Sequence, residues 1–269
     1  MKAGRSRVPP ARPFDTAPLR RIPTLMTYCV GLKMRAGLVM LSDTRTNAGV
    51  DNISTYRKTT LWGRPGKSVL CLTAAGNLAI TQAVVNRLRR GLEDGRHLDD
   101  APDMVSAAEI VGESIRAVHR ADGPALEAHD TAFNVTFLLG GQIRGGELRL
   151  FQIYSAGNFI EAMSDTHYLQ IGEHKYGKPI LDRTLNWETP LDEAVKVGLL
   201  SFDATMRSNL SVGLPLDLVV IPQDRARPVV TRRLDETDAY FARLSTDWGR
   251  LMNEARQQID TPDFMAGPA

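Results

Sequence analysis

The sequence is poor in the residues that mark disulfide-stabilised, metal-binding or membrane-spanning proteins. It has two cysteines, Cys29 and Cys71, which form neither a disulfide framework nor a zinc pattern and which suit a reducing, cytoplasmic compartment. Its five histidines include no pair spaced for a metal. The longest apolar runs, such as 216–221, are far too short to span a bilayer. We therefore expect no metal, no other cofactor and no membrane insertion.

Charge of one sign is also lacking, because the net charge is only +2 over 269 residues. Its distribution is uneven, however. Residues 1–26 carry six Lys and Arg against Asp15 alone, which leaves a net charge of about −3 for the remainder. The basic character of the chain therefore belongs to its first 26 residues, and we expect no nucleic-acid binding by the body.

Residues 1–26 contain five prolines and little apolar surface, which predicts a disordered leader. They lack the apolar core of a secretory signal. Two interpretations remain open: a propeptide that is cut off, or a translation start placed too early, with Met26 as the true initiator. The second is favoured, because an initiator Met followed by a small Thr is readily removed. Either event would leave Thr27 with a free α-amine.

A threonine at a chain terminus carries a nucleophile and a base on one residue. The hydroxyl of Thr27 would attack an amide carbonyl, and an α-amine with a pKa of about 7.7–8.0 is close enough to neutral to accept the hydroxyl proton. With residues 1–26 attached, the same nitrogen is an amide and cannot act as a base. A threonine in a strand is also very common, so the rest of the chain must distinguish the two interpretations.

The predicted strands come in antiparallel hairpins and the predicted helices in blocks. Residues 27–32 and 37–41 form one hairpin, 49–55 a loop, 68–75 a buried strand, and Asn77 caps the first helix. Further helices are predicted over 105–120, with Gly123 as its stop, and over 235–259. This order differs from the β–α alternation of parallel sheets. It predicts an α+β fold, a four-layer α-β-β-α sandwich of two antiparallel sheets, in one domain over 27–259 followed by a flexible tail over 260–269.

Several motifs resemble those of a known family. Thr27 at the start of a strand, the SDTR motif ending the next, Lys58 after a loop and Gly76 before the first helix resemble a proteasome-type β subunit. These proteins are N-terminal-nucleophile threonine peptidases. The stretches MTYCVGL, LSDTRTNAGVDNIS and LLSFDATMRSNLSVGLPLDL are similar to the bacterial Anbu proteins, the ancestral β subunits. The resemblance covers nearly the whole chain from Met26 and implies the N-terminal-nucleophile fold.

The resemblance also implies a role for each matching residue. Thr27 would be the nucleophile, and Lys58 the buried cation that disfavours protonation of the α-amine and stabilises a developing oxyanion. Asp43 would pair with Lys58 and hold it in place. Arg57 is the rival cation, and the family pattern rather than the spacing selects Lys58. The backbone N–H of Gly76, at a strand–helix bend, would contribute to an oxyanion hole.

Three serines complete the comparison. Ser155 and Ser211 match family serines that lie close to the nucleophile and its amine. Ser208 stands where many proteasome β subunits have an aspartate, so a carboxylate that would help orient the amine is absent from that position. Without the resemblance, Ser155 and Ser211 are more simply hydroxyls in a turn.

The expected activity is hydrolysis of peptide bonds in peptides or unfolded proteins, through an ester on Thr27, without a cofactor. The resemblance implies self-assembly into a ring-like homo-oligomer, and leaves open whether an ATP-dependent unfoldase is needed. Two alternatives remain. One is an amidase with the same fold that acts on small amides. The other is a catalytically weak assembly protein or peptide-binding scaffold, which the serine at 208 keeps open.

Overall fold

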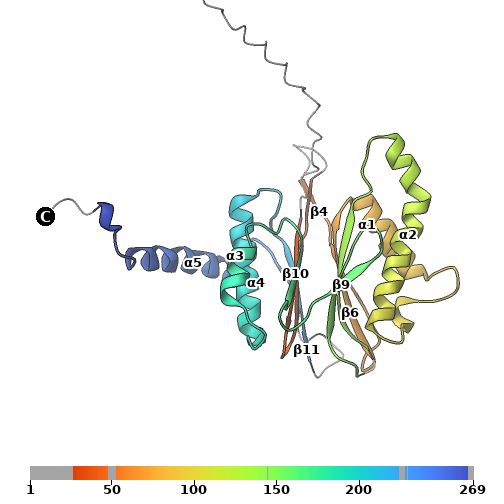
Figure 1. Ribbon diagram of the computed structural model, residues 1–269, viewed down its shortest axis with the longest axis horizontal. Coiled ribbons are helices and arrows are strands. Elements are labelled where there is room, and N and C mark those ends of the chain that lie inside the picture. The colour runs from red at the N-terminus through yellow and green to blue at the C-terminus, as the bar shows by residue number, and fades with distance from the viewer. Residues whose placement is uncertain (1–26, 48–52, 144, 224–227, 229, 266–269) are drawn as a thin grey trace, which may run out of the picture.

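The computed structural model describes residues 27–47, 53–143, 145–223, 228 and 230–265. Two five-stranded antiparallel sheets stack face to face at its centre (Figure 1). The first contains β10 (Tyr168–Gly172), β1 (Tyr28–Met34), β2 (Gly37–Asp43), β11 (Leu216–Pro222) and β12 (Val230–Leu234) in that order. The second contains β5 (Thr59–Trp62), β6 (Ser68–Gly76), β7 (Val135–Ile143), β8 (Arg149–Ile153) and β9 (Phe159–Glu161).

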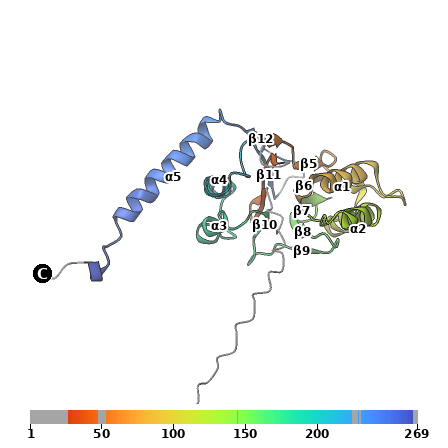
Figure 2. The ribbon, with the colours of Figure 1, turned by 90° about the horizontal axis from the view of Figure 1, so that it is seen from above.

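Helices cover the outer face of each sheet. The helices α1 (Leu78–Arg90) and α2 (Met104–Ala128) pack on the β5–β9 sheet, whereas α3 (Lys178–Thr184) and α4 (Leu191–Ser208) pack on the other (Figures 1 and 2). The four-layer sandwich predicted from the sequence is therefore confirmed. Because both faces of each sheet are buried, the central strands read as continuous apolar runs. Cys29 and Met40, for example, face the opposite sheet, while Tyr28 and Val39 face the helices.

The strand register brings four chain segments to one end of the sandwich. The start of β1 lies beside the end of β2, with Cys29 paired to Ser42. The start of β5 lies beside the end of β6, with Thr59 paired to Thr73. A hydrogen bond of 2.8 Å between the hydroxyls of Ser42 and Thr59 joins the two sheets at this end. Residues just outside these strands therefore meet between the sheets.

Some elements differ from the sequence-based predictions. The second helix continues through Gly123 and Pro124 to Ala128, because the proline removes a single helical hydrogen bond while Leu126 still packs against the core. Part of the predicted 49–55 loop is a strand: β4 (Ile53–Thr55) pairs with β3 (Arg45–Asn47), and residues 48–52 between them lie outside the described residues. The short helix α3 was not predicted.

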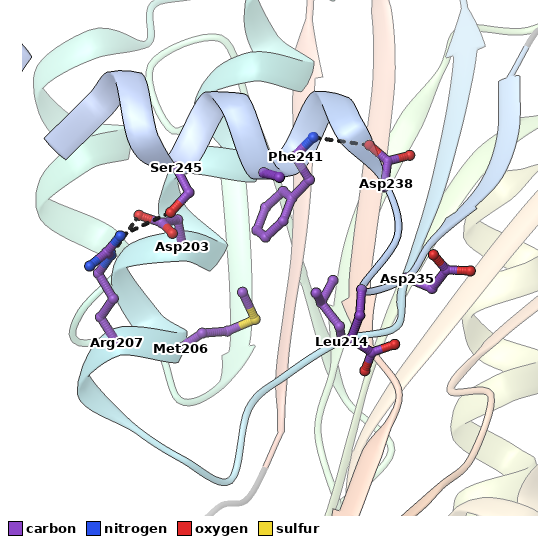
Figure 3. Close-up of a pocket in the computed structure, with 10 residues that line it drawn as sticks. Asp203, Met206, Arg207, Leu214, Asp235, Asp238, Phe241 and Ser245 are labelled. Atoms are coloured by element: carbon purple, nitrogen blue, oxygen red, sulfur yellow. Dashed lines mark hydrogen bonds and ion pairs between the residues drawn. The ribbon is translucent and has the colours of Figure 1, made fainter. Parts of the chain in front are cut away.

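The last helix, α5 (Ala239–Gln257), extends away from the body (Figures 1 and 2). It begins later than predicted, because Asp238 is its N-cap and accepts a hydrogen bond from the Phe241 amide. Only Phe241 and Leu244 of this helix are buried. A hollow of about 320 Å³ opens between α5 and α4, with Phe241 beside Met206 and with Asp203 beside Arg207 (Figure 3). After α5, the chain forms a short 3₁₀ helix, η2 (Asp263–Met265).

Candidate active site

Three buried polar side chains meet where the strand ends converge. The Thr27 hydroxyl donates a hydrogen bond of 2.6 Å to Oδ1 of Asp43. The Lys58 ammonium donates to the same oxygen at 2.7 Å and also contacts the Thr27 hydroxyl directly. Exposed fractions are 5% for Thr27, 0% for Asp43 and 9% for Lys58. The hydroxyl of Thr27 is thus held between a carboxylate and a cation, out of bulk water.

The ammonium of Lys58 is fully engaged. A lysine has three N–H donors, and here they serve Thr27, Asp43 and the backbone oxygen of Arg45, the last at 2.7 Å. Arg57, the rival cation, is exposed and lies near Asp217 instead, at 3.6 Å. The structure therefore brings the lysine, rather than its neighbour, to the buried carboxylate.

The Asp43 carboxylate depends on these donors for its charge. Burial raises its pKa, and Lys58 is the largest influence that lowers it again, followed by hydrogen bonds from Thr27 and from the Tyr28 amide. All three donors converge on Oδ1, whereas the buried Oδ2 has no hydrogen-bond partner among the described residues. A carboxylate in this position tolerates no loss of its cation.

Gly76 ends β6 in a conformation that only glycine adopts easily. Its φ is +117°, and a Cβ there would meet the backbone oxygen of Asn134 at 2.3 Å. The Asn77 amide donates a hydrogen bond to that same oxygen, so Asn77 and Asn134 form a hydrogen-bonded pair of the antiparallel ladder. The neighbouring pair, Gly76 and Val135, is therefore of the non-hydrogen-bonded type. The N–H of Gly76 therefore points away from β7, toward the side where β5 has not yet begun.

The three serines fall in different places. The Ser155 hydroxyl donates to the Val135 oxygen at 2.7 Å and accepts from the Val135 amide at 3.2 Å. Ser211 is partly buried, and its amide donates to the Asn209 side chain. Ser208 is exposed at the last position of α4. Within the described ranges, no hydrogen bond joins any of these three side chains to Thr27.

Comparisons with known proteins show the family of this chain. A family profile described as Proteasome subunit matches residues 26–221. This chain belongs to the proteasome subunit family. Anbu from Yersinia bercovieri, described as an ancestral beta-subunit, is 46% identical with a TM-score of 0.82, over 88% of this chain and 99% of that one. Anbu from Hyphomicrobium sp. strain MC1 is 47% identical with a TM-score of 0.79, over 88% and 100% of the two chains.

A third similar structure is described as the helical assembly of the Anbu complex from Pseudomonas aeruginosa. It is 44% identical with a TM-score of 0.85, over 90% of this chain and 100% of that one. A search among curated proteins finds no match. The family match and the three similar structures show that this proteasome-family chain has the N-terminal-nucleophile fold of the Anbu group.

Two residues of this proteasome-family chain that were not predicted hold the loop of Ser211 in place. The Arg45 guanidinium donates to the Leu210 oxygen at 2.7 Å and covers Gly213, so it fixes the loop that carries Ser211. Asn209 caps the end of α4 and holds the Ser211 amide. The motifs SDTR and RSNLSVG contain both residues, but only the fold places one motif on the other.

The structure gives little support for thiol or metal chemistry in the described part of this proteasome-family chain. Burial raises the pKa of the Cys29 thiol to about 12, despite the nearby Lys58, so this cysteine stays a thiol near neutral pH. Among the described residues, no group of three or more His, Cys, Asp or Glu is placed to hold a metal ion. No helix in the described ranges has the length and apolar character needed to cross a membrane.

Proposed function

We propose that this protein is a threonine-type peptidase with Thr27 as its N-terminal nucleophile. The observation that carries the proposal is the contact of the buried Thr27 hydroxyl with both Lys58 and Asp43. A nearby cation favours alkoxide character on the hydroxyl oxygen. Activity requires that the residues before Thr27 be removed, because only then does its nitrogen become a base.

The reaction follows from the positions of these groups. The Thr27 oxygen attacks the substrate carbonyl while the α-amine takes the hydroxyl proton. The carbonyl oxygen becomes an oxyanion, which the Gly76 N–H stabilises. The carbon–nitrogen bond of the substrate then breaks, its amine leaves with the proton held by the α-amine, and an ester to Thr27 remains. Water, activated by the same α-amine, hydrolyses the ester.

The proposed substrate is a peptide or an unfolded protein. Beyond Thr73, β6 has no β5 partner, because β5 begins at Thr59, which pairs with Thr73. Gly76 turns its backbone groups toward this unpaired side. An extended peptide would add there as a strand through main-chain hydrogen bonds, which favours peptides over small amides.

We also propose that the protein self-associates through α5. This helix leaves the body, and three of its large apolar side chains stay exposed: Tyr240, Leu251 and Met252, at 42%, 48% and 48%. Apolar side chains clustered on a projecting helix indicate an interaction surface. A second copy of the chain is the proposed partner, in a ring-like or helical homo-oligomer. The two buried free thiols suit a cytoplasmic location.

The mature N-terminus and its reactivity test this function together. Protein expressed from Met26 should show, by intact mass, a chain that begins at Thr27, and a peptide epoxyketone should add to it. Thr27→Ala should abolish both the adduct and peptide hydrolysis, whereas the exposed control Thr184→Ala, on α3, should keep both. Turnover that survives Thr27→Ala would place the nucleophile elsewhere, and a wild-type protein that takes no probe would contradict the peptidase proposal.

A further inference from the structure

A glutamate lies directly beside Thr27 in the extended β1–β10 ladder. The pairing of Tyr28 with Gly172 places Thr27 opposite Glu173, and the Glu173 amide donates to the Thr27 oxygen at 2.7 Å. Gly172 permits this approach: its φ is +82°, and a Cβ there would lie 2.0 Å from the Thr27 oxygen. In an antiparallel pair, a residue directs its nitrogen and its oxygen to the same side. The nitrogen of Thr27 therefore faces the chain at Glu173.

Two hydrogen bonds hold the Glu173 carboxylate in this region, and in the first of them Oε1 accepts from the Lys175 amide at 3.4 Å. Its Oε2 accepts a hydrogen bond of 3.1 Å from the Asn209 amide, and the other side of that amide accepts from the Ser211 N–H at 3.0 Å. Glu173 and Asn209 are both partly buried. One carboxylate thus connects the end of β10, the cap of α4 and the loop that contains Ser211.

Ser208, the last residue of α4, is exposed and brings no carboxylate to this region. We propose that Glu173 is the residue that positions the α-amine of Thr27, by placing a carboxylate beside it. This inference rests on the proposed function. It assigns the missing negative charge to a different segment, at the end of β10 rather than the end of α4.

The carboxylate acts on the charged form of the amine. When the Thr27 hydroxyl gives up its proton, the amine becomes an ammonium, and a neighbouring carboxylate stabilises that ammonium without taking the proton. The carboxylate also raises the pKa of the amine in the free enzyme, whereas the Lys58 cation lowers it. Charged side chains on the segments that contact Thr27 are Asp43 at the end of β2, Lys58 before β5 and Glu173 after β10. His174 and Lys175 follow Glu173 in the chain, and Arg45 accepts a hydrogen bond from Lys58 through its backbone oxygen.

The test replaces Glu173 with glutamine, which keeps the size of the side chain and a hydrogen bond to Asn209 but removes the charge. In protein matured to Thr27, Glu173→Gln should lower kcat about tenfold, the equivalent of one charge-assisted hydrogen bond, with KM within about twofold. The acid limb of kcat/KM should move to lower pH by on the order of one unit, because the amine pKa falls. Glu193→Gln, an exposed carboxylate in the first turn of α4, is the matched control and should change neither quantity.

A purely structural role for Glu173 predicts a different result. It would alter stability or KM but leave the pH profile of Glu173→Gln at its wild-type position, and that outcome overturns the inference. Competitive acetylation of the N-terminus with acetic anhydride across pH measures the amine pKa without turnover. If the wild-type protein neither cleaves peptides nor takes the epoxyketone, the proposed function fails, and the acetylation result still decides whether Glu173 sets the amine pKa.

Discussion

Removal of the Lys58 charge is the most direct test of the buried site. Lys58→Met keeps a side chain of similar length but leaves the Asp43 carboxylate, which is 0% exposed, without the cation now 2.7 Å from its Oδ1. Removing one partner of a buried ion pair typically costs about 3–5 kcal/mol of unfolding free energy, because the remaining charge stays desolvated. We expect the cost of Lys58→Met to fall within this range, because Oδ2 of Asp43 already has no hydrogen-bond partner in the described part of the chain.

The loss should depend on pH with a defined sign. Burial raises the pKa of Asp43 above its ordinary value of 3.8, and Lys58→Met removes the largest opposing influence. A carboxyl whose folded pKa is raised contributes stability below its unfolded pKa, and this contribution is lost as pH rises through the folded pKa. Lys58→Met should therefore lose less stability relative to wild type at pH ~5 than at pH ~8.

Urea unfolding followed by circular dichroism, at one fixed protein concentration because of the proposed self-association, measures these differences. A double-mutant cycle with Asp43→Asn isolates the pairwise term, and the double variant should be more stable than Lys58→Met alone. The exposed Lys196→Met, which breaks a surface pair with Glu193, is the control and should leave the midpoint unchanged. A Lys58→Met variant as stable as wild type at pH ~8, or a coupling energy near zero, would refute the buried-pair reasoning.

Three further predictions concern the glycine bend, the loop and the last helix. Gly76→Ala should lose about 1–3 kcal/mol of unfolding free energy from backbone strain and about a hundredfold in kcat. The control Gly66→Ala, also at positive φ but with open space around it, should lose stability only. Thermal melts and peptide assays on both variants check this. Arg45→Met should speed amide hydrogen exchange over 209–213 while the unfolding free energy stays within about 1 kcal/mol of wild type. Unchanged exchange would show that Arg45 does not fix the loop. Leu251→Glu combined with Met252→Glu should dissociate the oligomer in light scattering without a loss of helix content, and an unchanged mass would remove α5 from the interface.

The sequence alone predicted the layers because these depend on local patterns, whereas Thr27 as the proposed nucleophile came from its place after Met26 together with the family resemblance. Apolar runs bounded by turn residues define the central strands, and Asn77 after a glycine marks the start of α1, where its side chain accepts from the Ala79 amide at 2.9 Å. Met26, directly before Thr27, is apparent from the sequence itself. Errors arose where tertiary packing overrides a local signal, as when α2 continues through Gly123 because Leu126 still finds the core.

The tertiary structure decided which charges meet. Lys58 and Arg57 are adjacent cations, and composition cannot distinguish them, but the start of β5 directs Lys58 to Asp43 and leaves Arg57 exposed. Glu173 lies 146 residues from Thr27 in the chain. It becomes the neighbour of Thr27 only because β10 pairs with β1 and Gly172 allows a close approach. Residue type and local periodicity thus determine the elements, whereas strand register determines the electrostatic partners of the proposed nucleophile.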